Sequence, residues 1–291
     1  MNIDQFLAEP GKFKSLRDYS TNSTAGISDK SEAEAQMNKY IKEMQDVQDR
    51  LYADNAHSLL VIFQAMDGAG KDSTIKHVMS GINPQGCQVY SFKQPSVEEL
   101  DHDFLWRTTK CLPERGRIGI FNRSYYEEVL IVKVHPEIIL KQKLPGIDSL
   151  EKINEEFWDT RYKSIMDMER HLAHNGTTVL KFFLHVSKEE QADRFLKRIN
   201  EPEKNWKFAL SDIEERMYWD DYQKAYETMI AKTSTAFAPW YIIPADRKWY
   251  MRLAVAEIIL QRMRILGLKY PTLTEKQIAD LEKGKESLLG N

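Results

Sequence analysis

The segment AMDGAGKDST (65–74) has most of the features of a phosphate-binding loop. The usual pattern G-x-x-x-x-G-K-[ST] would have glycine at Ala65 and a hydroxyl at Asp72, whereas Gly70 and Lys71 match it. Backbone N–H groups of such a loop point at an anion, assisted by the positive end of the helix that follows. The missing hydroxyl normally binds Mg²⁺, and a carboxylate is a stronger ligand for a hard cation because it adds charge to oxygen. The loop therefore predicts a phosphate site with a carboxylate metal ligand.

An apolar strand-like run precedes this loop and a helical pattern follows it, as a phosphate loop requires. The glycines permit a tight backbone, and the lysine brings positive charge to phosphate oxygens. We expect phosphate contacts from Gly68, Ala69, Gly70, Lys71, Asp72 and Ser73. The alternative is an ordinary glycine-containing turn with a solvated lysine.

A second motif, RIGIFNRSYYEEVL (117–130), reads as a strand that ends in polar residues. A Walker B strand usually ends in an acid, whereas this one ends in Asn122, which could bind a metal only through a neutral carbonyl oxygen. Arg123 would lie at the carboxyl end of the sheet, where open α/β folds bind ligands. Glu127 lies one helical turn later and could complete a metal site. Packing is the expected role of the two tyrosines, and a solvated helix face is the alternative for the two glutamates.

The third motif, residues 193–226, is rich in cations although the chain as a whole has a net charge of -3. Its cations are Arg194, Lys197, Arg198, Lys204, Lys207 and Arg216. They surround a loop that contains Pro202, between two helical stretches. A charged helix face is the alternative, but this arrangement favours a lid that closes over phosphates and excludes water.

The elements that must position these motifs alternate along the chain. The pattern predicts strands at 58–64, 87–92, 117–122, 177–186 and 238–244. It predicts helices at 32–55, 72–82, 97–112, 151–174, 188–199, 211–232 and 247–266. This alternation is typical of a parallel sheet covered on both faces. We expect an irregular N-terminal arm (1–30), one domain (31–270) with a lid at about 194–224, and a C-terminal tail (271–291).

Composition sets further limits on partners. Hydrophobic residues make up 42% of the chain and charged residues 29%, which is ordinary for a globular domain. The net charge gives no general attraction to nucleic acid or to a membrane surface. The N-terminus lacks the features of a signal peptide, no apolar run approaches the roughly 20 residues that span a bilayer, and the two cysteines show no paired spacing. We therefore expect a cytoplasmic protein.

Taken together, the three motifs resemble those of the family-2 polyphosphate kinases across about residues 35–265. MDGAGKD matches the family's Walker A variant, FNRSYYEE its Walker B, and KRINEPEKNWKFALSDIEERMYWDDY its lid. The resemblance implies a P-loop kinase of thymidylate-kinase-like, three-layer α/β/α fold, with a parallel central sheet and a helical lid. It also implies Mg²⁺, with Mn²⁺ as a substitute, and a homo-oligomer (dimer or tetramer). The implied reaction is reversible transfer of the terminal phosphoryl group of inorganic polyphosphate to AMP or ADP, which yields ADP or ATP.

The resemblance also implies roles for individual residues. Catalytic positions are matched by Asp67, Lys71, Asn122 and Arg123, metal positions by Asp72 and Glu127, and lid contacts to phosphate by Arg194, Arg198, Lys204 and Lys207. Asn122 stands where many members carry Asp, which indicates the subgroup that accepts both AMP and ADP. The attacking nucleotide phosphate has a second pKa near 6, so it is largely anionic at neutral pH and needs no general base.

Two other functions compete with this interpretation. An ATP-dependent nucleoside monophosphate kinase would share the fold, but it would be expected to keep the hydroxyl that Asp72 replaces. A non-catalytic sensor of polyphosphate or nucleotides would be expected to lose Lys71, Arg123 or the metal carboxylates, and all are present.

Overall fold

A six-stranded sheet forms the centre of the computed structural model, which describes residues 1–290. The strands are β1 (Leu7–Ala8), β2 (Ser58–Gln64), β3 (Cys87–Ser91), β4 (Ile118–Asn122), β5 (Thr177–His185) and β6 (Trp240–Pro244), in the order β1-β6-β5-β2-β4-β3. Strands β2 to β6 pair in parallel, which confirms the expected parallel sheet. β1 pairs antiparallel with β6, so the expectation of a wholly irregular arm is wrong at Leu7–Ala8.

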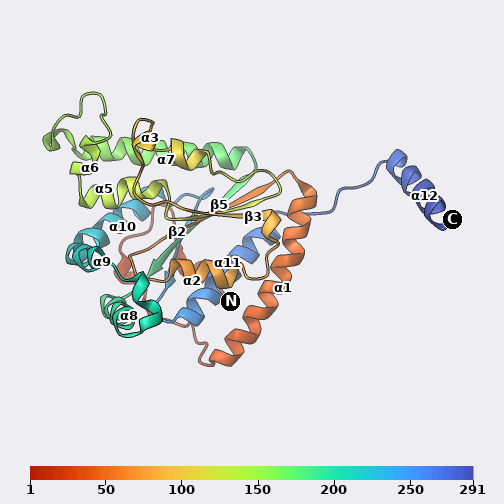
Figure 1. Ribbon diagram of the computed structural model, residues 1–291, viewed down its shortest axis with the longest axis horizontal. Helices are drawn as coiled ribbons and strands as arrows, with labels where there is room; N and C mark the ends of the chain where they lie inside the picture. Colours follow the sequence, from red (N-terminus) through yellow and green to blue (C-terminus); the bar gives the residue numbers. More distant parts are fainter. Residues whose placement is uncertain (291) are drawn as a thin grey trace.

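Helices cover both faces of the sheet and make the three layers visible in Figure 1. One layer contains α1 (Lys30–Asp54), α2 (Lys71–Val78) and α11 (Lys248–Ile265), which pack against one another. The other contains α5 (Ile131–Val134), α7 (Glu155–His174) and α10 (Trp219–Thr233). All seven residues of β2 and all five of β6 are buried, which explains their nearly continuous apolar sequences.

The expected helix at 97–112 is wrong, because the chain there forms two short helices. These are α3 (Val97–Leu100) and α4 (Trp106–Thr109). Between them the Asp103 carboxylate accepts a hydrogen bond from the Leu105 N–H at 2.9 Å. Such a local side-chain bond competes with helix continuation.

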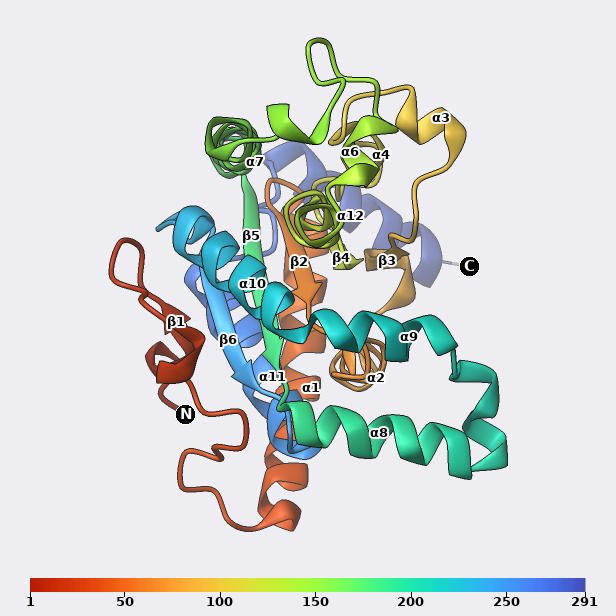
Figure 2. The same ribbon diagram turned by 90° about the vertical axis from the view of Figure 1, so that its left-hand side faces the viewer.

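The lid region leaves the sheet after β5 and returns through α10. It contains α8 (Lys188–Asn200), the 3₁₀ turn η6 (Pro202–Lys207), α9 (Leu210–Glu215) and η7 (Arg216–Tyr218). Figure 1 places α8 and α9 at the end of the sheet toward which β5 points, and Figure 2 shows them on either side of α2. The lid therefore covers the carboxyl ends of the parallel strands.

The remaining elements are short or peripheral. They are η1 (Asp4–Phe6), η2 (Leu16–Asp18), η3 (Pro84–Gly86), η4 (Tyr125–Val129), α6 (Glu137–Leu140), η5 (Leu150–Lys152) and α12 (Glu275–Leu289). The tail after residue 270 thus contains a helix, α12, whose residues are all exposed and which lies apart from the layers in Figure 1. No helix within residues 1–290 is both long and apolar enough to cross a membrane.

Candidate active site

The loop between β2 and α2 has the backbone that phosphate binding requires. Gly68 and Gly70 have φ of +83° and +108°, a region that side chains disfavour. A Cβ on Gly68 would also lie 3.1 Å from Cε1 of Phe195 on α8. Because Gly70 directly precedes the first residue of α2, the free N–H groups of that helix open onto the loop.

Lys71 lies at the base of this loop and is 8% exposed. Its Nζ donates to the Ala65 carbonyl at 2.8 Å and lies 3.7 Å from Oδ1 of Asp67. Burial lowers the pKa of Lys71, and the neighbouring Asp67 carboxylate opposes that shift. The ammonium is thus placed under the loop with an acid beside it.

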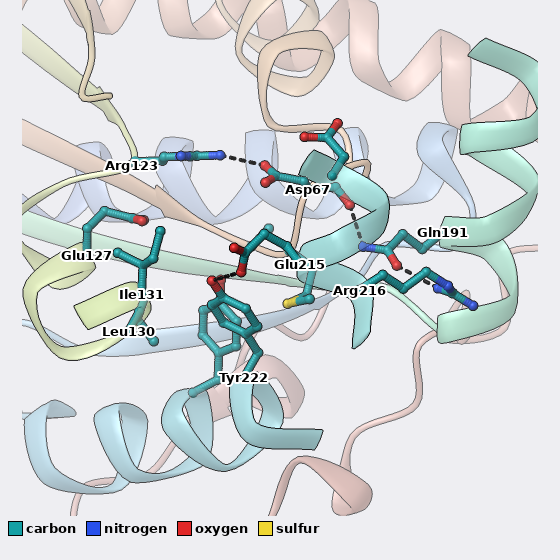
Figure 3. Close-up of a pocket in the computed structure, with 13 residues that line it drawn as sticks. Asp67, Arg123, Glu127, Leu130, Ile131, Gln191, Glu215, Arg216 and Tyr222 are labelled. Atoms are coloured by element: carbon teal, nitrogen blue, oxygen red, sulfur yellow. Dashed lines mark hydrogen bonds and ion pairs between the residues drawn. The ribbon is translucent and has the colours of Figure 1, made fainter. Parts of the chain in front are cut away.

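Arg123 reaches across from the end of β4 to the same acid. Its Nη2 donates to Oδ1 of Asp67 at 2.6 Å (Figure 3). Burial alone would raise the pKa of Asp67, but Lys71 and Arg123 outweigh it and hold the pKa below its usual range. Burial alone would likewise lower the pKa of Arg123, but the carboxylates of Glu127 and Asp67 raise it. Both members of the pair are therefore charged at neutral pH.

Glu127 belongs to the same group of charges. Glu127 is partly buried, and this desolvation raises its pKa, while Arg123 and Lys71 oppose the shift. With its amide oriented to satisfy both neighbours, Gln64 donates to Oε1 of Glu127 at 2.8 Å. The structure thus gathers Asp67, Lys71, Arg123 and Glu127 at the carboxyl ends of β2 and β4.

Asp72 and Asn122 lie beside this group and contact one another. Nδ2 of Asn122 donates to Oδ1 of Asp72 at 2.6 Å. Within residues 1–290, no three His, Cys, Asp or Glu side chains gather closely enough to hold a metal on their own. Mg²⁺ usually takes one or two carboxylates and completes its shell with waters and substrate phosphates. The oxygen donors of Asp72, Asn122 and Glu127 fit such a substrate-completed site.

Arg194 is placed differently from the phosphate contact predicted for it. Its Nη1 donates to the carbonyls of Gly68 (3.2 Å) and Ala69 (2.5 Å), and its Nη2 to those of Ala245 (2.6 Å) and Asp246 (3.2 Å). The residue is 5% exposed. The guanidinium is thus engaged by backbone oxygens on either side of it and supports the phosphate loop, while its contact to phosphate stays a prediction.

The other predicted lid cations each have a local partner. Nη1 of Arg198 is 3.0 Å from Oδ2 of Asp212, and its charge helps to lower the pKa of Asp67. Lys204 pairs with Glu201 and is partly exposed, and Nζ of Lys207 lies 4.9 Å from the ring centroid of Trp206. Only Arg198 of these three is near the charges around Asp67.

A cleft that opens to solvent lies between this group and the lid (Figure 3). Several lining residues were missed by the sequence-based prediction: Gln191, Asp212, Glu215, Tyr222 and Tyr226. Gln191 is the most direct link, because its Nε2 donates to the Asp67 carbonyl at 2.7 Å and its Oε1 accepts from Arg216 at 2.6 Å. The i, i+4 spacing of Tyr222 and Tyr226 predicts one helix face, but it does not distinguish a core from a cleft.

A strand, a phosphate loop and a helix beneath a helical lid define a P-loop kinase-like phosphotransferase. The family model for Polyphosphate kinase 2 (PPK2) matches residues 27–269. The chain therefore belongs to the polyphosphate kinase 2 family, which confirms the resemblance and makes it an enzyme.

Individual relatives agree with this assignment. The chain is 56% identical to an ADP-polyphosphate phosphotransferase of Rhodopseudomonas palustris over 249 residues, covering 86% of this chain and 85% of the relative. It is 44% identical to an AMP/ADP-polyphosphate phosphotransferase of Meiothermus ruber over 252 residues, covering 86% and 88%. The crystal structure of polyphosphate kinase 2 from Arthrobacter aurescens TC1 superposes with a TM-score of 0.84 at 36% identity, covering 95% of this chain and 98% of that one.

Proposed function

We propose that this enzyme transfers the terminal phosphoryl group of inorganic polyphosphate to ADP, giving ATP, and to AMP, giving ADP, reversibly and with Mg²⁺. The observation that carries the proposal is the replacement of the usual loop hydroxyl by Asp72. This residue is hydrogen-bonded to Asn122 and lies beside the Lys71–Asp67–Arg123 group. The names of the two relatives, which refer to ADP and to AMP and ADP, support the choice of acceptors.

The residues of this chain would act by positioning and by neutralising charge. A nucleotide phosphate oxygen forms a bond to the terminal phosphorus while the bridging P–O bond breaks, which leaves polyphosphate one unit shorter. Lys71 and Arg123 would stabilise charge on the transferring group, and the lid would exclude water. Bound Mg²⁺, held by Asp72 with Asn122 or Glu127, would supply further charge neutralisation on phosphate oxygens.

An ATP-dependent nucleoside monophosphate kinase is the alternative. It would form ADP from AMP and ATP without polyphosphate. Asp72 argues against it, because that class is expected to keep the hydroxyl after the loop lysine.

The direct test incubates the purified protein with long-chain polyphosphate, Mg²⁺ and either ADP or AMP, and separates the nucleotides by chromatography. Parallel reactions omit polyphosphate, replace it with ATP, or contain EDTA. We expect ATP from ADP, and ADP followed by ATP from AMP, only when polyphosphate and Mg²⁺ are both present. Conversion of AMP that depends on ATP alone would establish the alternative, and no conversion in any reaction would refute both.

The setting of the enzyme is part of the proposal. Its nucleotide substrates and its two unpaired cysteines support a cytoplasmic location, and its net charge gives no reason for a nucleic-acid partner. We propose a homo-oligomer, a dimer or a tetramer, on the strength of the family resemblance. Light scattering during size-exclusion chromatography would give a monomer mass if this proposal is incorrect.

A further inference from the structure

Residues 123–129, which include η4, form the turn that carries Arg123 and Glu127. A fully buried ion pair lies directly behind this turn. Nζ of Lys181, in the middle of β5, is 2.7 Å from Oε2 of Glu169 on α7, and both side chains are 0% exposed. Replacing a buried ion pair with apolar groups often costs a protein nothing in stability. The pair therefore calls for an explanation other than stability.

Every polar atom of this pair has a partner, and two of the partner groups are hydroxyls from the turn. Lys181 also donates to the Tyr126 hydroxyl and the Thr233 carbonyl, each at 2.8 Å. Oε1 of Glu169 accepts hydrogen bonds from the hydroxyls of Tyr125 (2.9 Å) and Tyr126 (2.7 Å). The pair thus joins β5, α7, the turn η4 and the last residue of α10.

The same helix holds the turn at a second point. Nη1 of Arg161 is 2.8 Å from Oε2 of Glu128, and both side chains are 5% exposed. The same Nη1 donates to the Glu128 carbonyl at 3.3 Å. Arg161 and Glu169 are eight residues apart, about 12 Å along the helix. Helix α7 therefore contacts the turn at two separate sites.

The turn needs such support because it begins from an unfavourable backbone. Arg123 has a φ of +63°, a conformation rare for residues other than glycine, and its N–H donates to the Phe63 carbonyl at 3.0 Å. Tyr125, Tyr126 and Glu128 point into the protein toward α7, whereas Arg123 and Glu127 line the cleft. The anchored and the cleft-lining residues therefore interleave along one short segment.

We infer that Lys181 and Glu169, acting through Tyr126, are positioning residues that fix the turn so that Arg123 meets the transferring phosphoryl group and Glu127 keeps its place beside Arg123 in the cleft. The inference rests on the proposed function, since it concerns the same site. Loosening the turn lowers kcat, because contacts made in the transition state lose their geometry. KM changes little, because the phosphate loop and the lid still hold the substrates.

The test compares Tyr126→Phe with Ser58→Ala. The first removes one buried hydroxyl from the network. The second removes the buried hydroxyl that pairs with Thr177 Oγ1 at 2.9 Å, at the opposite end of the sheet from the cleft. For Tyr126→Phe we expect kcat to fall at least tenfold with both KM values within twofold of wild type. Ser58→Ala is expected to lower the melting temperature similarly and leave kcat unchanged. Equal kcat values for the two variants would overturn the inference.

A double-mutant cycle supplies the decisive readout. If the network acts partly through Arg123, the kcat loss of the double variant Tyr126→Phe with Arg123→Ala is smaller than the product of the two single losses, whereas fully multiplicative losses would refute the inference. The double variant Lys181→Met with Glu169→Gln removes both charges but keeps an acceptor for the tyrosines. It is expected to fold and to show the same selective loss of kcat, and a wild-type kcat in this variant would also count against the inference. A wild-type protein inactive with polyphosphate would refute the proposed function instead, so the two failures are distinguishable.

Discussion

The side chains of Asn122 and Asp72 meet at 2.6 Å, and their hydrogen bond joins the end of β4 to the first turn of α2. An amide in this position donates to one carboxylate oxygen of Asp72 and leaves the other available to the proposed metal. The same contact ties the phosphate loop to the strand that Arg123 directly follows. The loop has Asp72 where the usual pattern has a hydroxyl, and the neighbouring strand has Asn122 where a Walker B strand usually has an acid. The two unusual residues therefore contact one another.

Asp72→Asn should remove the charge that we propose binds Mg²⁺ while keeping the size of the side chain. We expect kcat to fall by about 10² to 10³-fold, the cost typical of losing one charged transition-state contact, without a change in melting temperature. The measurement is steady-state ATP formation across a Mg²⁺ titration. Asp159→Asn, which alters an exposed ion pair with Lys232, is the matched control. Wild-type turnover at saturating Mg²⁺ would rule out the metal assignment.

Arg123→Ala and Lys204→Ala should separate catalysis from substrate holding. Arg123 contacts Asp67 in the cleft, whereas Lys204 is partly exposed on η6. We expect the first variant to lower kcat and kcat/KM together by about 10² to 10³-fold, and the second mainly to raise KM for polyphosphate. Initial rates at varied polyphosphate concentration would decide. Exchanged phenotypes would exchange the two roles, and two wild-type variants would refute the role of the lid cations.

The sequence predicted the phosphate loop, the polar end of β4 and the alternation of strands and helices, because each depends on local spacing. It did not predict β1, because a two-residue strand carries no pattern and pairs with a segment more than 200 residues away. It did not predict the backbone carbonyls that Arg194 contacts, since a basic residue in a motif does not reveal which oxygens it meets. Lys181 did leave a signal, because a lysine within the apolar run TTVLKFFLHV requires a buried partner.

Arg194→Lys tests whether this residue supports the loop. The guanidinium donates to four backbone carbonyls from two segments, and a lysine ammonium cannot reproduce that planar arrangement. Each buried carbonyl left without a donor costs about 1 to 3 kcal/mol. We expect a free energy of unfolding at least about 2 kcal/mol lower than wild type, measured by urea denaturation. An Arg194→Lys variant of unchanged stability but weakened polyphosphate binding would restore the predicted phosphate contact.

His185 should make the stability of the enzyme depend on pH. It lies at the carboxyl end of β5 and is 8% exposed, and within residues 1–290 its Nδ1 has no hydrogen-bond partner. Burial lowers its pKa to about 4, although Asp246 opposes the shift. Between about pH 6.5 and pH 4 the unfolded chain therefore takes up a proton that the folded protein does not, so stability falls as pH falls. From pH 7 to pH 5 the loss from this group is about 2 kcal/mol.

The measurement is urea denaturation at pH 7, 6 and 5 for wild type, His185→Gln and His174→Gln. His185→Gln should lose about 2 kcal/mol less than wild type over this range, because its side chain does not titrate. His174, exposed at the end of α7, serves as the control, and its variant should follow the wild-type profile. Since other groups titrate equally in all three proteins, the difference between the profiles isolates His185. Parallel profiles for wild type and His185→Gln would show that the imidazole does not stay neutral in the folded protein.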